Sequence, residues 1–139
     1  MDVEIRLLTS ADAAIFDHVA DEVFDEPIDP KRLAAYLAEP GHFMLAALAG
    51  NEVVAQVTAV IHRHPDKVTE LYIDEVGVTP AYQRQGLARR MIEEMFAIGR
   101  ARGCKEAWVG TEHDNVPARR LYESGGSEAE PFVMYVYRL

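Results

Sequence analysis

Short stretches in which apolar and polar residues alternate, or in which apolar residues run together, predict β-strands along most of the chain. Val3, Ile5 and Leu7 alternate with charged residues, and the run from Phe43 to Ala49 is wholly apolar. The apolar patterns and the Gly, Pro and Asn turns between them predict six strands, over residues 2–8, 42–49, 52–62, 68–78, 105–111 and 132–139. A seventh strand near 126–130 is an alternative.

Apolar residues three or four positions apart, together with capping residues, predict about four helices. The longest extends from residue 86 to about 102, with Leu87, Met91 and Met95 on one face, and Gly103 ends it. The others cover residues 10–24 with Thr9 or Ser10 as cap, 30–38 after Asp29-Pro30, and 115–125. The chain is therefore expected to be a single α/β domain over residues 1–139.

Composition and length limit the class of protein. The 139 residues suit one domain, and 49% hydrophobic with 27% charged residues is ordinary for a globular protein. No apolar run approaches the ~18 residues that a membrane span needs. The acidic start, Met1-Asp2-Val3-Glu4, is unlike a signal peptide. The single cysteine, Cys104, excludes an intramolecular disulfide and is interpreted as a packing residue. We expect a cytoplasmic protein that binds no membrane.

The charge is unevenly distributed. The formal net charge is −9, which argues against a nucleic-acid-binding protein. Residues 1–75 carry 15 acidic residues against 5 Lys and Arg, whereas residues 76–139 carry 8 acidic residues against 9 Lys and Arg. This division suits a cation at one part of the molecule and an anion at another.

The segment from Val76 to Ala88 leads from a strand through a turn to a helix that small residues open. The first N–H groups of a helix lack internal partners, and the helix dipole adds positive charge there. Gly86 lets an anion approach the backbone closely, and Arg84 and Arg89 add full charges. These features indicate a pyrophosphate site. The alternative is a helix that merely starts after a turn.

Two motifs resemble those of the Gcn5-related N-acetyltransferases. The first is Gln83-x-x-Gly86-x-Ala88 after a strand, and the second, downstream, contains Asn115, Ala118, Leu121, Tyr122 and Gly125. The resemblance covers nearly the whole chain. It implies a mixed, mostly antiparallel sheet of six to seven strands flanked by about four helices. One departure is Gly126, where the family has a large apolar residue; Phe132 is expected to fill that gap.

The resemblance also implies a site for acetyl-coenzyme A. Backbone N–H groups would cradle its pyrophosphate, and the backbone at Val76 and Val78 would pair with the pantetheine arm where the fourth strand splays from the fifth. Asn115 would contact the pantetheine or cap its own helix. The loop residues assigned to the cofactor are Gln83, Arg84, Gln85, Gly86, Leu87, Ala88 and Arg89.

Three residues are candidates for proton transfer. Tyr122 matches the family's tyrosine that protonates the leaving thiolate; the alternative is a tyrosine that only packs its helix on the sheet. Asp74 and Glu75 are both candidate bases for the amine, directly or through water. A strand alternates its side chains, so the two should face opposite ways unless a bulge, expected near residue 76, changes the facing.

The acceptor is expected to be a small cationic amine. The resemblance places the connection between the first two helices at the acceptor pocket, and carboxylates cluster there. With acids near the fourth strand and in the tail, the candidate acceptor-binding residues are Asp21, Glu22, Asp25, Glu26, Asp74, Glu128 and Glu130. Glu70 to Val78, the loop and the tail look most like the aminoglycoside 3-N-acetyltransferase branch.

Several alternatives stay open. The acceptor could instead be a polyamine or a protein amine, and a coenzyme A-binding module without turnover is the non-enzymatic alternative. A homodimer is an open question. His62 and His64 form a His-x-His pair, but the sequence offers no evident third ligand, so no metal site is predicted.

Overall fold

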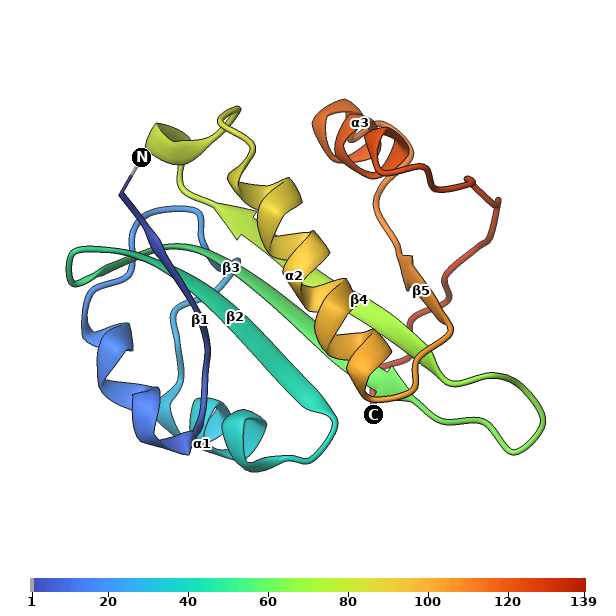
Figure 1. Ribbon diagram of the computed structural model, residues 1–139, viewed down its shortest axis with the longest axis horizontal. Helices are drawn as coiled ribbons and strands as arrows, with labels where there is room; N and C mark the ends of the chain where they lie inside the picture. The colour runs from blue at the N-terminus through green and yellow to red at the C-terminus, as the bar shows by residue number, and fades with distance from the viewer. Residues whose placement is uncertain (1) are drawn as a thin grey trace.

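The stretches that the apolar pattern predicts as strands form one sheet in the computed structural model, which describes residues 2–139 (Figure 1). Neighbouring strands follow the chain order, from β1 to β5. The first four pair antiparallel and β5 pairs parallel with β4, which confirms a mixed, mostly antiparallel sheet. The strands are β1 Glu4–Leu7, β2 His42–Ala49, β3 Glu52–His62, β4 Glu70–Val78 and β5 Glu106–Val109.

Both faces of the central strands are buried. Leu45 and Ala47 of β2 pack in the cluster beneath α2, while Met44 and Ala46 pack in a second cluster with Leu33 of α1. A strand covered on both faces has no polar face, which explains why β2 is a continuous apolar run. The helices are α1 Pro30–Ala38, α2 Leu87–Ala101 and α3 Val116–Ser124, with 3-10 helices η1 Ser10–Asp17 and η2 Pro80–Tyr82.

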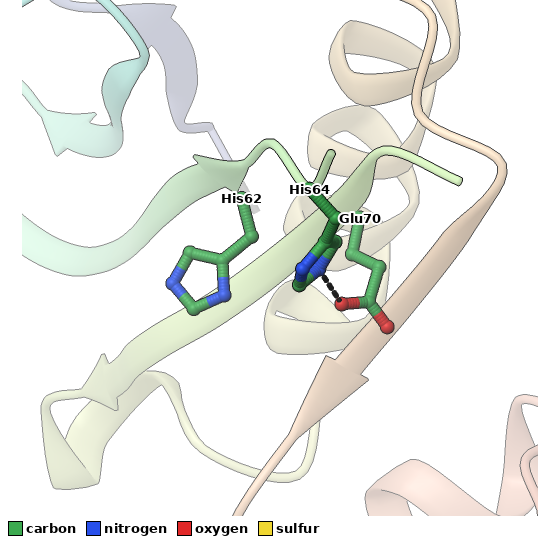
Figure 2. A group of neighbouring side chains, drawn as sticks. All are labelled: His62, His64 and Glu70. Carbon is green, nitrogen blue, oxygen red and sulfur yellow. Dashed lines mark hydrogen bonds and ion pairs between the residues drawn. The ribbon is translucent and has the colours of Figure 1, made fainter. Parts of the chain in front are cut away.

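α2 lies across one face of the sheet (Figure 1). Its apolar stripe is buried, with Leu87, Met91 and Met95 at most 2% exposed. The strands β3 and β4 beneath it form a hairpin whose turn end carries His62, His64 and Glu70 (Figure 2). Among residues 2–139, no helix is long and apolar enough to cross a membrane. The cytoplasmic location stays a prediction.

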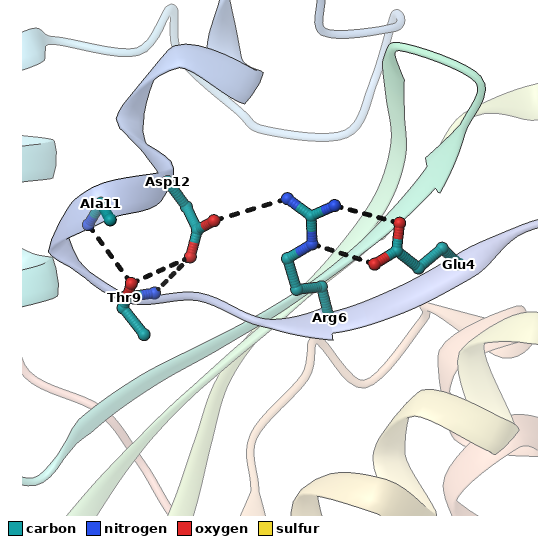
Figure 3. Close-up of polar contacts among 5 residues, drawn as sticks. All are labelled: Glu4, Arg6, Thr9, Ala11 and Asp12. Carbon is teal, nitrogen blue, oxygen red and sulfur yellow. Dashed lines mark hydrogen bonds and ion pairs between the residues drawn. The ribbon is translucent and has the colours of Figure 1, made fainter.

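The first predicted helix is shorter than expected. Thr9 caps it, since its hydroxyl accepts from the Ala11 N–H at 3.2 Å and its own N–H donates to Asp12 at 2.7 Å (Figure 3). The 3-10 helix ends at Asp17 rather than near residue 24. Val19 forms a parallel bridge with Val53. The pairing with the sheet therefore overrides the helical tendency of residues 18–24.

The predicted closing strand over 132–139 is wrong, as is the alternative strand near 126–130. Neither stretch pairs with the sheet, so the sheet has five strands within residues 2–139 instead of six or seven. The Phe132 ring lies close to Gly110, yet Phe132 is 66% exposed. The other exposed apolar side chains of this tail are Val133, Met134, Tyr135, Val136, Tyr137 and Leu139.

Candidate active site

A β-bulge sets the two carboxylates of β4 side by side. Thr58 of β3 lies opposite Glu75, and Ala59 lies opposite Ile73, so Asp74 is the extra residue. The bulge is thus two residues before the position expected from the sequence. A bulge interrupts the regular alternation of side chains along a strand. As a result, Asp74 and Glu75 line the same cavity.

This cavity has a volume of about 340 Å³ and is bordered by β4, the segment 22–25, the loop 110–112 and α3. Its lining is rich in acidic side chains and also includes Asn115 and Tyr122. Carboxylates converging on one hollow produce a negative potential that attracts cations. The acidic residues that line it are Glu22, Asp25, Asp74, Glu75 and Glu112.

The environment of Glu75 favours its neutral form. Partial burial raises the pKa of the Glu75 carboxyl, and the charges of Asp74 and Asp25 raise it further. A hydrogen bond from Gln56 opposes this effect. A carboxylate with a raised pKa is a stronger base than an ordinary one. Glu75 is therefore suited to accept a proton from a substrate ammonium.

Two residues without a predicted role let the acidic segment lie against the sheet. The buried Gln56 side chain donates from Nε2 to the Val23 carbonyl at 3.2 Å and to Glu75 Oε2 at 3.4 Å. A Cβ on Gly77 would lie 2.0 Å from the same Val23 carbonyl oxygen. Only glycine permits this approach. In the sequence, the features that could have pointed to these contacts are a polar Gln within the apolar β3 and a Gly within β4.

Tyr122 lies across the cavity on α3. Burial raises the pKa of its phenol, so the hydroxyl remains protonated at neutral pH. The ring packs against the main core, as one of the predicted alternatives had it, and the side chain also lines the cavity. Asn115 caps α3, since its Oδ1 accepts from the Ala118 N–H at 3.2 Å, and it lines the cavity too.

The loop before α2 leaves a row of backbone N–H groups without acceptors among the described residues. Arg84 and Gly86 have left-handed backbones, with φ of 60° and 80°. The N–H groups of residues 84–89 donate no hydrogen bond within the part of the chain that the structure describes. The Gln83 side chain donates to the Val78 carbonyl at the end of β4, and the Gln85 side chain donates to the Ala81 carbonyl. Two glutamines therefore fix the loop while its N–H groups stay available.

The other candidate residues of this loop lie at the start of α2. The Leu87 side chain is buried in the core, so only its backbone N–H is available to a ligand. Ala88 follows it, and the exposed Arg89 pairs with Glu93 at 3.4 Å. All three belong to the first turn of the helix, where the dipole favours an anion.

The strands β4 and β5 separate next to this loop. Their parallel pairing ends at Ile73 opposite Val109. Beyond it, Asp74 to Val78 has β3 on one side and no strand on the other. The backbone of Val76 and Val78 therefore has no strand partner on the side of β5 among residues 2–139, and α3 lies near the same end of the sheet (Figure 1).

The predicted acceptor residues divide into two groups. Glu22, Asp25 and Asp74 line the cavity. Asp21, Glu26, Glu128 and Glu130 are exposed and do not line it. Glu112, on the loop after β5, lines the cavity but was not predicted. Its position depends on where α3 folds back, which residue spacing does not reveal.

Comparisons with known proteins identify the family of this chain. The sequence model of the Acetyltransferase (GNAT) family matches residues 11–126. The chain therefore belongs to the GNAT family and is an acetyl-CoA-dependent N-acetyltransferase. The resemblance seen in the two motifs is confirmed.

Relatives differ in the acceptors that they are named for. N-alpha-acetyltransferase RimI of Mycobacterium tuberculosis is 29% identical over 140 residues, covering 99% of this chain and 85% of that protein. An aminoglycoside acetyltransferase, HMB0005, from an uncultured soil metagenomic sample has a TM-score of 0.82 at 22% identity, covering 100% of both chains. A second from such a sample, meta-AAC0020, solved with sisomicin, has a TM-score of 0.79 at 21% identity, covering 99% of this chain and 95% of that one.

Replacing Gly86 with Val should abolish acetyl-CoA binding while the protein still folds. The left-handed backbone there disfavours a Cβ, and the side chain would project into open space beside the free N–H groups. Gly103→Val is a matched control, because Gly103 is also left-handed with open space around it but ends α2. Isothermal titration calorimetry of both variants tests the site. An unchanged affinity in folded Gly86→Val would contradict the pyrophosphate assignment.

Proposed function

We propose that this acetyltransferase acts on a primary amine of a small polycationic acceptor, of which an aminoglycoside is the type. The observation that carries the proposal is the cavity of about 340 Å³ lined by five carboxylates. Concentrated like charge destabilises a fold, and a ligand with several ammonium groups would offset that repulsion. The fold shared with two aminoglycoside acetyltransferases adds support.

The residues of the site fit the chemistry of direct transfer. Acetyl-CoA supplies an acetyl thioester. The N–H groups of residues 84–89 would hold its pyrophosphate, and the open edge of β4 at Val76 and Val78 its pantetheine arm. Glu75 accepts the proton that the acceptor ammonium must lose to become a nucleophile, directly or through a water molecule. Tyr122 holds a proton that it can donate to the departing sulfur.

A competing candidate is an acetyltransferase of a protein amine. The similarity to RimI over nearly the whole chain favours it. For the two candidate functions, KM for the acceptor should depend differently on the negative charges of the cavity. A polycation contacts several carboxylates of the cavity at once, whereas an α-amine of a peptide brings a single positive charge to the reacting position.

The experiment is a free-thiol release assay over aminoglycosides, polyamines and peptides at two salt concentrations. For a polycation, KM should rise with salt, because partly exposed ion pairs are screened over a Debye length of ~10 Å at 0.1 M. Asp25→Asn should raise KM, and Glu26→Gln, which alters a neighbouring carboxylate outside the cavity, should not. If a peptide is acetylated with a higher kcat/KM than every polycation, and its KM does not change with salt, the result would favour a protein amine as the acceptor.

The sequence resemblance also predicts the 3-N position of an aminoglycoside. NMR of the acetylated product identifies the modified nitrogen directly. A product acetylated at another amine would contradict the branch assignment and leave the polycation proposal intact.

We also propose that the chain forms a homodimer. The support is the exposed apolar tail 132–139 together with the free second edge of β5. An open strand edge and an unpaired apolar segment can each pair with another copy. Light scattering should give twice the 15.5 kDa of one chain, and removal of residues 132–139 should give the monomer. A monomer at full length would contradict the proposal.

A further inference from the structure

We propose that His62, His64 and Glu70 form a binding site for a divalent transition-metal ion such as Zn²⁺. The sequence shows the two histidines but no third ligand, and the fold supplies one. One candidate ligand atom from each side chain lies within 4.8 Å of the other two. Figure 2 shows the three side chains grouped at the turn end of the β3–β4 hairpin.

The hairpin dictates this arrangement. His62 is the last residue of β3 and lies opposite Glu70, the first residue of β4. His64 follows two positions later, just beyond the end of the strand, and its ring centroid lies 6.3 Å from that of His62. His64 Nε2 lies 2.5 Å from Glu70 Oε1. Two imidazoles and one carboxylate are therefore brought together at the turn end of the hairpin.

The surroundings limit the freedom of the cluster without closing it. The centroid of the His62 ring lies 5.8 Å from that of Tyr72 and 6.1 Å from that of Trp108. The Tyr72 and Trp108 rings stack with their centroids 4.2 Å apart. The His64 and Glu70 side chains are 26% and 23% exposed. The Tyr72 and Trp108 rings thus restrict the His62 side chain. The partial exposure of His64 and Glu70 gives an ion access from solvent.

The chemistry of the ligands selects the class of ion. Two imidazole nitrogens and one carboxylate oxygen match zinc, which binds such groups at about 2.0–2.2 Å and usually takes four ligands. Tetrahedral bonds of that length place ligand atoms about 3.4 Å apart. To reach that spacing, the His64–Glu70 pair must open by about 0.9 Å, and no other pair must close by more than about 1.4 Å, which side-chain rotations can supply. A water molecule would complete the coordination.

The site is separate from the cavity that carries the acetyl-transfer chemistry. None of its three residues lines that cavity. A bound ion would join the end of β3 to the start of β4 and so stabilise the hairpin. The alternative is that His64 and Glu70 form only a hydrogen-bonded pair and that His62 only packs on the aromatic rings.

Two measurements on the full chain distinguish these alternatives. Calorimetric titration with Zn²⁺ should give one ion per chain. Trp108 is the sole tryptophan, so binding of paramagnetic Ni²⁺ beside His62 should quench the intrinsic tryptophan fluorescence with the same stoichiometry. Zn²⁺ added first should prevent the Ni²⁺ quenching, because both ions would use the same ligands.

Variants locate the ion. Removing one ligand should weaken metal affinity by at least tenfold, since even outer-shell changes cost about 10–100-fold. We expect this for His62→Ala and for Glu70→Gln, which keeps the shape of the side chain. His113→Ala, a histidine outside the cluster, is the control. Circular dichroism of the metal-free variants confirms that they fold.

Three results would overturn the proposal. The first is the absence of Zn²⁺ binding by the folded wild-type chain. The second is a metal affinity in His62→Ala and Glu70→Gln equal to that of the wild type. The third is a loss of affinity in His113→Ala as large as the loss in those two variants. Any of these results would mean that His64 and Glu70 form only a hydrogen-bonded pair and that His62 only packs on the aromatic rings.

Discussion

Glu75→Gln should lower kcat by about 10²-fold or more, the usual scale for loss of a general base, and should also stabilise the fold. The glutamine keeps the size of the side chain and an oxygen that can accept from Gln56, but it cannot accept the substrate proton. The stabilisation follows because burial and the charges of Asp74 and Asp25 raise the pKa of Glu75. Its ionised form is therefore more costly in the folded protein than in the unfolded chain.

The sign of the pH dependence follows from the same shift. A carboxyl whose pKa is raised on folding binds more protons in the native state than in the unfolded state. The wild-type protein should therefore lose stability, relative to Glu75→Gln, as pH rises from the ordinary glutamate pKa through the raised one. In kinetics, kcat/KM of the wild type should fall as pH drops through the raised pKa, and this acidic limb should be absent in Glu75→Gln.

Asp74→Asn is the matched comparison. Asp74 lines the same cavity and is the bulged residue beside Glu75. If Glu75 is the base, Asp74→Asn should lower kcat less and should shift the acidic limb to lower pH, since a neighbouring negative charge is removed. Steady-state rates across pH measure the change in kcat and in the acidic limb, and thermal melts across pH measure the change in stability. A larger loss of kcat in Asp74→Asn would assign the base to Asp74.

The strands and α2 are predictable because local pattern and burial agree. β2 lies between two apolar clusters, so its sequence is apolar throughout, and α2 covers one face, so its apolar residues recur at helical spacing. Pro30 behind the Asp29 cap likewise fixed the start of α1, because proline at the first helical turn loses no hydrogen bond. At these positions the local preference and the tertiary environment favour the same structure.

The tail and the first helix were mispredicted because tertiary pairing decides them. Residues 132–139 have the apolar composition of a strand, but a strand also needs a paired edge, and composition does not report whether one is reached. The stretch after Asp17 has helix-forming residues, yet the bridge between Val19 and Val53 draws it to the sheet. Both errors concern contacts between residues far apart in the sequence.

The candidate site was only partly predictable for the same reason. The loop at residues 83–89 and Tyr122 belong to local motifs, so the sequence indicates them. Gln56 donates to the Val23 carbonyl, and Gly77 packs closely against it, although Val23 lies more than thirty residues from Gln56 along the chain. Gln56 bonds the acidic segment to the sheet, and Gly77 leaves room for that segment beside β4. These roles exist only once the strand and the segment are brought together.

Tyr122→Phe should lower kcat by about 10²-fold or more, the scale expected when a general acid is lost, with little change in the affinity for acetyl-CoA. Phenylalanine preserves the ring that packs on the core and removes only the hydroxyl. Because burial raises the pKa of Tyr122, the wild-type hydroxyl carries its proton throughout the neutral range. The defect should therefore be constant between about pH 6 and 9, well below the ordinary tyrosine pKa of about 10.

Tyr36→Phe separates this chemical role from packing. The Tyr36 hydroxyl donates to the Phe43 carbonyl at 2.7 Å and does not line the cavity. Its removal leaves a carbonyl with one partner fewer, which should lower the free energy of unfolding by about 1 kcal/mol and leave kcat nearly unchanged. Steady-state kinetics and denaturant unfolding of both variants give the two readouts. If Tyr122→Phe instead lost stability and kept its kcat, Tyr122 would be a core residue, and the proton for the departing sulfur would have to come from solvent.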